Sequence, residues 1–384
     1  MFNILTLNKI AECGMQQLPD EHFHSSAEQE NPDGIILRSF QMDEKHLTPN
    51  LLAIARAGAG VNNIPVDTCA QKGIVVFNTP GANANAVKEL VIFGLIAASR
   101  KVVQGINWTQ GLAGTTGVAE AVEKGKADFA GPEIMGKTLG VVGMGAIGIL
   151  VANAAAQLGM NVAGFDPWLT EQNAAKLDPK VKMEPALDAL LAASDYVTLH
   201  QPLTPDTKKM FGAELFAKCK NGMRLLNFAR GELVCAESVK KALESGKLSC
   251  YVIDFPDETV LGIDGIITIP HLGASTPESE DNCAFMAASQ LREFILTGNV
   301  VNSVNYPDCR LDSAGGARVC VLSKKADMAE ITKAVSGIGK ILGTASKENK
   351  EYAYAIFDVD AQGAGDLGAI EKIANVTRVR AIGK

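Results

Sequence analysis

The sequence lacks the features that mark membrane-spanning, disulfide-stabilised and nucleic-acid-binding proteins. Its eight cysteines contain no C-x-x-C pair and follow no repeated spacing, so we expect neither a disulfide framework nor a zinc site. The most apolar stretch, residues 90–99, is too short to cross a bilayer. Acidic residues outnumber basic ones by 43 to 36, so no nucleic-acid partner is expected. No secretory signal pattern follows Met1, and reduced thiols fit the cytoplasm, where we expect the protein to work.

What the chain does have is a globular composition and a repeated alternation of short strands and helices. Hydrophobic residues make up 47% of the 384 residues and charged residues 21%, which suits two or three domains. The alternation predicts βαβ units with parallel strands in two doubly wound domains, with long helices over 84–104 and 277–298. The expected strands are 3–7, 34–39, 51–58, 74–80, 138–143, 161–166, 196–202, 224–231, 249–254 and 265–270.

The pattern changes after Pro307. Residues 317–383 follow the order strand, helix, strand, strand, helix, strand, with the second helix expected over 365–376. A βαββαβ order in so short a segment predicts a small ferredoxin-like domain. The fold class is therefore α/β, with two Rossmann-like or flavodoxin-like parallel-sheet domains and this C-terminal module.

The run VVGMGAIG places Gly143, Gly145 and Gly148 in G-x-G-x-x-G spacing between an expected strand and an expected helix. Such glycines permit a tight turn, let a pyrophosphate approach the helix N-terminus, and let helix and strand pack closely. Asp166 ends the next strand, eighteen residues after Gly148, where an acid accepts hydrogen bonds from the adenosine ribose. A carboxylate there repels a 2′-phosphate, so we expect NAD rather than NADP.

Three later strand ends carry groups for proton transfer and anion binding. They supply Arg230, the acids of IDFPDET, and His271. In an open α/β sheet, functional residues collect at the carboxyl ends of the strands. An imidazole can take a proton from an alcohol, a carboxylate can orient it, and an arginine can bind a carboxylate bidentately. Each of these residues alone could be a solvated or paired surface group, but together, on successive strand ends of one dinucleotide fold, they predict a functional site at this edge of the sheet.

The chain resembles the D-2-hydroxyacid dehydrogenase family, and within it the phosphoglycerate dehydrogenases. The matching stretches are GAGVNNIPVD, AVKELVIFGLIAASR, VVGMGAIG, SDYVTLHQPLTPDTK, LLNFARGELV and PHLGAST. The resemblance implies a substrate-binding domain of residues 1–90 and 280–307, an NAD-binding domain of residues 91–279, and an ACT-like domain of residues 316–384. It implies that Arg230 binds the substrate carboxylate, that His271 is the acid/base, and that a glutamate, here Glu258, is the partner of the histidine.

The resemblance also implies which residues contact the cofactor and the substrate. His200 lines the cofactor site and is not catalytic. The cofactor contacts are Gly143, Gly145, Ala146, Ile147, Gly148, Asp166, His200, Pro202, Ala229, Arg230, Asp254, His271 and Gly273. The substrate contacts are Arg38 and Ser39 for a phosphate, with Gly60, Val61, Asn62, Asn83 and Arg230.

The choice among the three acids of IDFPDET stays open on one point. The family's strand end is D-V-F-x-x-E-P, and here one residue is missing after Asp254. Alignment on the following Phe255 makes Glu258 the partner of His271, and Asp254 then matches the acid that meets the nicotinamide amide. Asp257 remains the alternative partner.

The expected reaction is the oxidation of 3-phosphoglycerate to 3-phosphohydroxypyruvate, the entry to serine synthesis. Alternatives are a hydroxypyruvate/glyoxylate reductase, an erythronate-4-phosphate dehydrogenase, and a non-enzymatic NAD-sensing protein like the C-terminal binding protein co-repressors. Serine-responsive relatives carry an N-x-P-G-type turn that SKKADMAE lacks, so we expect the C-terminal module to serve assembly. The long helix from Ala84 and the stretch of residues 106–136 resemble the family's dimerisation region, so we expect a homodimer or homotetramer. We expect no membrane partner.

Overall fold

The computed structural model describes residues 1–360 and 366–383. It divides the chain into two compact units, one of Met1–Asn83 with Pro277–Lys384 and one of Ala84–Thr276. The three-domain division given above, with its boundaries, stays a prediction.

The first unit is built on a five-stranded parallel sheet. Apolar side chains from both faces of its strands are buried, as a parallel sheet covered on both sides requires. The order is β2 (Phe23–Ser26), β1 (Phe2–Leu7), β3 (Gly34–Leu37), β4 (Ala53–Arg56), β5 (Val75–Phe77). The helical segments of this part are α1 (Glu12–Met15), η1 (Glu44–His46), α2 (Val66–Gln71) and α11 (Pro277–Thr297). Long helix α11 buries Leu291 and Phe294 in the same core as β1, β3 and β4.

The same unit contains a four-stranded antiparallel sheet near the C-terminus. Its order is β14 (Lys340–Glu348), β15 (Ala353–Asp360), β13 (Ala317–Ser323), β16 (Val376–Ile382), which is the ferredoxin-like order. The helices are α12 (Met328–Ser336) and α13 (Gly368–Glu371). The helix expected over 365–376 is therefore much shorter, and its expected first residue, Gly365, lies outside the described residues.

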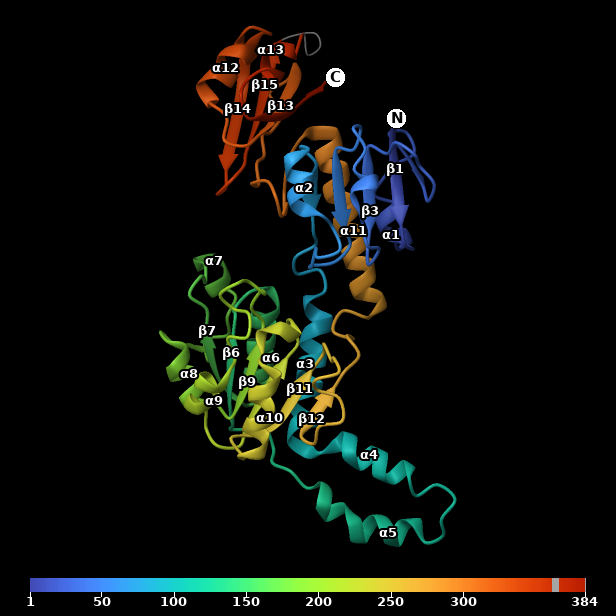
Figure 1. Ribbon diagram of the computed structural model, residues 1–384, viewed down its shortest axis with the longest axis vertical. Helices are drawn as coiled ribbons and strands as arrows, with labels where there is room; N and C mark the ends of the chain where they lie inside the picture. Colours follow the sequence, from blue (N-terminus) through green and yellow to red (C-terminus); the bar gives the residue numbers. More distant parts are fainter. Residues whose placement is uncertain (361–365, 384) are drawn as a thin grey trace. The chain divides into compact units, whose positions relative to one another are not determined.

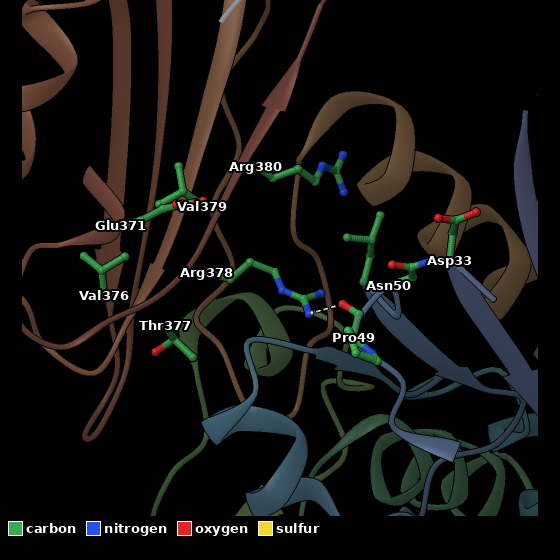
Figure 2. A pocket seen from close by; sticks show the side chains of 10 residues that line it. Asp33, Pro49, Asn50, Glu371, Val376, Thr377, Arg378, Val379 and Arg380 are labelled. Atoms are coloured by element: carbon green, nitrogen blue, oxygen red, sulfur yellow. Dashed lines mark hydrogen bonds between the residues drawn. The ribbon is translucent and has the colours of Figure 1, made fainter. Parts of the chain in front are cut away.

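Two arginines of β16 connect this sheet to the rest of the first unit. Arg378 donates hydrogen bonds to the backbone carbonyls of Leu51 and Pro49, the latter at 2.9 Å (Figure 2). Arg380 donates to the carbonyls of Phe294, at 2.9 Å, and Ile295 near the C-terminal end of α11. Both arginines line a polar cavity of about 500 Å³. Cations near a helix C-terminus are stabilised by its dipole, and Arg380 lies at that end of α11.

The second unit is a seven-stranded, wholly parallel sheet with the doubly wound order. The order is β12 (Ile266–Thr268), β11 (Leu248–Ile253), β10 (Met223–Asn227), β9 (Tyr196–Leu199), β6 (Thr138–Val142), β7 (Asn161–Phe165), β8 (Lys182–Met183). The helical segments are α3 (Ala84–Arg100), α4 (Val102–Gln110), α5 (Val118–Gly125), η2 (Lys126–Phe129), α6 (Ala146–Gln157), α7 (Glu171–Ala174), α8 (Leu187–Ala193), α9 (Ala213–Lys218), η3 (Gly231–Leu233) and α10 (Ala236–Glu244).

Alternate residues of these strands face opposite layers of helices. Val141 packs in the core with α3 and α6, whereas Val142 packs in the core with α8, α9 and α10. A strand has a side-chain period of two, so strands covered on both faces become continuous apolar runs. This observation confirms the α/β fold class.

The prediction of one helix over residues 84–104 is wrong in length, because the helix is shorter. Helix α3 ends at Arg100 and Lys101 takes a left-handed backbone with φ 45°, after which α4 begins. The carbonyl of Ser99 is approached by Gly131, where a Cβ would lie 1.9 Å from that oxygen. Helices α4 and α5 then form an arm that extends away from the seven-stranded sheet (Figure 1). None of the helices in residues 1–360 and 366–383 is long and apolar enough to cross a membrane.

Candidate active site

The glycine-rich turn joins β6 to α6 at the carboxyl edge of the seven-stranded sheet. Gly143 has φ 93°, and a Cβ on it would lie 2.8 Å from the backbone nitrogen of Gln201. A Cβ on Gly148 would lie 2.0 Å from the carbonyl oxygen of Gly143. By contrast, a Cβ on Gly145 would meet nothing within 4 Å, so the N-terminus of α6 is open on that side. These three glycines fit a dinucleotide whose pyrophosphate lies at the start of α6.

Asp166 follows β7 and holds the neighbouring backbone. Its two carboxylate oxygens accept hydrogen bonds from the backbone N–H groups of Met144 and Trp168, each at 2.8 Å. The bond to Met144 ties the acid to the glycine-rich turn. A carboxylate oxygen can accept more than one hydrogen bond, so Asp166 keeps capacity for ribose hydroxyls.

His200 lies beside the same turn in a desolvated position. Its Nε2 is 2.9 Å from Thr198 Oγ1, and its buried Nδ1 has no hydrogen-bond partner in the described residues. Burial lowers the pKa of His200 from 6.5 to about 3, because it disfavours the charged ring. The imidazole is therefore neutral near pH 7, which fits a residue that lines a cofactor site and does not transfer protons.

This shift predicts a specific acid sensitivity. The unfolded chain protonates His200 near pH 6.5, whereas the folded chain resists protonation until about pH 3, so folding stability falls as pH drops through this range. We expect the His200→Gln variant to lose less stability than the wild type between pH 7 and about pH 4.5. Urea unfolding at the two pH values measures this, with exposed His24→Gln as the control. An equal loss in both variants contradicts the prediction.

Arg230 and His271 both lie close to one aromatic ring, that of Phe255. The guanidinium carbon of Arg230 is 5.7 Å from the ring centroid of Phe255, and the His271 ring centroid is 4.4 Å from it. Arg230 follows β10, and Phe255 follows β11, its neighbour in the sheet. A guanidinium and an imidazole thus lie together at one sheet edge. Phe255 was not singled out from the sequence, although its place between two acids of IDFPDET was the available signal.

Asp254 fixes the backbone next to the histidine. Its carboxylate is buried and accepts hydrogen bonds from the N–H groups of Leu272 and Gly273, each at 2.8 Å. Burial raises the pKa of Asp254, against the opposing effects of Gly273, Leu272 and His271. His271 itself has a left-handed backbone with φ 52°. The acid therefore holds a turn that a non-glycine residue adopts only at a cost.

The other two acids of IDFPDET differ in their contacts. Asp257 accepts hydrogen bonds from the N–H and hydroxyl of Thr259, at 2.9 and 2.5 Å. Glu258 is exposed. Within the described residues, the histidines that form ion pairs are His22 and His46, so neither acid is paired with His271 here. The partner of His271 stays a prediction.

The loop after β3 presents Arg38 and Ser39 in the first unit. The side-chain oxygen of Asn8 accepts hydrogen bonds from three successive N–H groups, those of Arg38, Ser39 and Phe40, at 3.2, 3.0 and 2.8 Å. The amide of Asn63 donates to the carbonyls of Arg38 and Phe40, at 3.2 and 2.8 Å. Asn8 and Asn63 were missed by sequence reasoning, because they act on the loop from distant positions in the chain.

The remaining predicted substrate contacts also belong to the first unit. Gly60 and Val61 are partly buried, and Asn62 is exposed. Asn83 has a buried Oδ1 without a hydrogen-bond partner in the described residues. Arg38 already has an acidic partner, since its Nη2 lies 2.7 Å from Glu280 Oε1 at the start of α11. Glu280 is a second residue that the sequence did not single out.

A doubly wound sheet with this turn and this acid defines a dinucleotide-binding domain. Residues 92–273 match the family model described as "D-isomer specific 2-hydroxyacid dehydrogenase, NAD binding domain". The chain belongs to the D-isomer-specific 2-hydroxyacid dehydrogenase family, and its dinucleotide is NAD. The resemblance and the cofactor expected from the sequence are thereby confirmed.

Three similar proteins illustrate the relationship. A D-3-phosphoglycerate dehydrogenase of Methanocaldococcus jannaschii is 35% identical over 270 residues, which is 68% of this chain and 49% of that protein. The crystal structure of NAD⁺-bound 3-phosphoglycerate dehydrogenase from Entamoeba histolytica has a TM-score of 0.62 at 28% identity and covers 79% of this chain and 98% of that one. A glyoxylate reductase from Paecilomyes thermophila has a TM-score of 0.65 at 26% identity, with 79% and 98% covered. The chain spans about half the length of the first curated relatives it matches.

Proposed function

We propose that this protein uses NAD to oxidise 3-phosphoglycerate to 3-phosphohydroxypyruvate, the first step of serine biosynthesis. The observation that carries the proposal is that Arg230 and His271 both lie against the ring of Phe255, at one edge of the seven-stranded sheet. Relatives named D-3-phosphoglycerate dehydrogenase support the choice of substrate. We propose the cytoplasm as its location, since all eight cysteines are free thiols.

Each residue of the second unit at the proposed site has a separate role in the reaction. His271 takes the proton of the C2 hydroxyl and returns it in the reverse direction. Arg230 binds the substrate carboxylate through paired charge-assisted hydrogen bonds and so orients C2. Asp254 holds the turn that carries His271. NAD, when bound, accepts the hydride from C2. The proposed cofactor contacts are those predicted from the sequence, from Gly143 to Gly273.

The groups of the first unit are proposed to recognise the rest of the substrate. Arg38 and Ser39 bind the phosphate, because a guanidinium and a hydroxyl are suited to phosphate oxygens. Gly60, Val61 and Asn62 meet the substrate carboxylate through their backbone, and Asn83 offers its unpartnered Oδ1 to a substrate hydroxyl.

Reduction of 3-phosphohydroxypyruvate by NADH tests the proposal directly. Loss of NADH absorbance is followed with this substrate and, in parallel, with hydroxypyruvate and 2-oxoglutarate. We expect the highest kcat/KM with 3-phosphohydroxypyruvate. Turnover of none of the three substrates would point to a non-enzymatic NAD-binding protein, and preference for an unphosphorylated substrate would also overturn the proposal.

One observation favours a second candidate, a glyoxylate or hydroxypyruvate reductase. Arg38 is engaged by Glu280, so the guanidinium proposed for the phosphate is partly neutralised. The similarity to a glyoxylate reductase is compatible with this candidate. The substrate panel above separates the two functions.

We propose Glu258 as the carboxylate that pairs with His271 during turnover. A neighbouring carboxylate stabilises the imidazolium, so its removal makes the ring easier to deprotonate. We expect Glu258→Gln to lower kcat and to move the acid limb of the pH–rate profile for oxidation to lower pH. The matched Asp257→Asn variant should leave that limb in place, because Asp257 is held by Thr259. The opposite result would make Asp257 the partner.

We propose a homodimer or homotetramer assembled through the arm of α4 and α5. Trp108 of α4 and Phe129 of η2 pack at 5.2 Å between ring centroids, but neither α4, α5 nor η2 has a buried residue. Apolar side chains remain exposed along the arm and near it, at Ile106, Val118 and Met135. Exposed apolar side chains on such an arm are available to a partner subunit. Light scattering during size-exclusion chromatography should give at least twice the mass of the chain; a monomer overturns the proposal.

We also propose that the ferredoxin-like module serves assembly and does not respond to serine. The segment SKKADMAE forms the end of β13 and the start of α12, with Asp327 capping the helix through the N–H groups of Ala329 and Glu330. Activity should therefore stay unchanged when serine is titrated; inhibition would contradict this role.

A further inference from the structure

The ion pair between Arg38 and Glu280 lies where the proposed function puts the substrate phosphate. Arg38 Nη2 and Glu280 Oε1 are 2.7 Å apart, and both side chains are partly exposed. The side chain of Arg38 extends from a loop whose backbone is held by hydrogen bonds to Asn8 and Asn63. The side chain of Glu280 extends from the first turn of α11, a long helix that packs in the core of the same unit. The two groups are therefore brought together by rigid elements on both sides.

The position of Glu280 has a direct electrostatic consequence. A helix N-terminus favours a carboxylate, and Glu280 lies in the first turn of α11 where it meets Arg38. An exposed ion pair is weak, and a phosphate with nearly two negative charges can displace the carboxylate from Arg38. The displaced carboxylate stays close to the phosphate, because its helix is fixed. Like charges at such a distance repel, most strongly at low ionic strength.

We propose that Glu280 is a specificity-determining residue that reduces the preference for phosphorylated over unphosphorylated 2-hydroxy acids by competing for Arg38. This inference rests on the function proposed above and adds a residue to it. Glu280 acts on the phosphate end of the substrate alone. It therefore changes KM for phosphorylated substrates and leaves kcat, which depends on His271 and Arg230, unchanged.

The chain offers a matched control in the same turn of the helix. Glu278 is exposed two positions before Glu280, and the ion pair of Arg38 is made with Glu280 and not with Glu278. Glu278→Gln and Glu280→Gln change the net charge equally and leave α11 with one acid fewer in its first turn. Only the second variant releases Arg38.

The test is steady-state kinetics of both variants and the wild type with NADH. Each is assayed with 3-phosphohydroxypyruvate and with hydroxypyruvate. The assays are run at about 20 mM salt, where charges are weakly screened, and at about 300 mM salt, where they are strongly screened. We expect Glu280→Gln to lower KM for the phosphorylated substrate by about fivefold at low salt, less at high salt. KM for hydroxypyruvate and kcat for both substrates should stay within about twofold of wild type, and Glu278→Gln should behave like wild type. Calorimetric titration with 3-phosphoglycerate should show the same gain in affinity.

Two results would overturn the role of Glu280. An unchanged KM shows that the carboxylate does not compete for Arg38. A raised KM shows that Glu280 only positions Arg38 for the phosphate. Failure of the proposed function has a different signature, since the wild type would then not turn over 3-phosphohydroxypyruvate. If Glu280→Gln turns over 3-phosphohydroxypyruvate and the wild type does not, the proposed role of Glu280 is supported. If neither the wild type nor Glu280→Gln turns it over, the proposed role of Glu280 is wrong as well.

Discussion

Replacing His271 with asparagine is expected to lower kcat by about 10²- to 10⁴-fold, the usual contribution of a positioned acid/base. Asparagine is the appropriate replacement because His271 has φ 52°, and asparagine tolerates a left-handed backbone better than most residues. The turn held by Asp254 should therefore persist.

Two further measurements isolate the chemical step for this variant. NADH binding, followed by fluorescence, should change far less than kcat, and exposed His22→Asn should match the wild type. An His271→Asn protein with nearly wild-type kcat would show that another group transfers the proton. Loss of NADH binding in parallel with kcat would assign His271 to the cofactor alone.

Replacing Arg230 with glutamine is expected to lower kcat/KM by about 10²-fold or more. Two hydrogen bonds to a charged group are worth about 1.5–3 kcal/mol each, and 1.4 kcal/mol corresponds to a factor of ten. Arg230→Lys should recover only part of the loss, because lysine keeps the charge but cannot bind a carboxylate through a planar fork.

The control for Arg230 is the exposed Arg100 at the end of α3. Arg100→Gln removes a positive charge from the same unit and should leave kcat/KM close to wild type. If Arg230→Lys is as active as the wild type, the bidentate contact is not needed and the proposed role of Arg230 is wrong.

The parts of the fold that depend on local pattern were predictable from the sequence. Continuous apolar runs such as TLGVVG predicted buried parallel strands, and the two cores on either side of β6 show why both faces are apolar. Gly143 and Gly148 were predictable because their lack of a side chain is itself the requirement of the turn. The edge strand β2 was missed, because FHSS is half polar and only its pairing with β1 makes it a strand.

Arrangements that depend on contacts between residues far apart in the sequence could not be predicted from the sequence. Arg230 and His271 both come close to Phe255 because β10 and β11 are neighbours in the sheet. The break at Lys101 lies beside the close approach of Gly131 to the carbonyl of Ser99, which no periodicity reveals. The proposed site residues, including Glu258, stay predictions until their variants are measured.

The sequence by itself determined the α/β class, the glycine-rich turn, the family and the cofactor. It could do so because periodicity and short motifs are local properties of the chain. Only the tertiary structure decided that Asp254 supports the turn of His271, that Asn8 holds the loop of Arg38, and that Glu280 occupies its guanidinium. The physical reason is that a hydrogen bond or an ion pair acts only over a few ångströms, and the packing of distant segments decides which groups come that close.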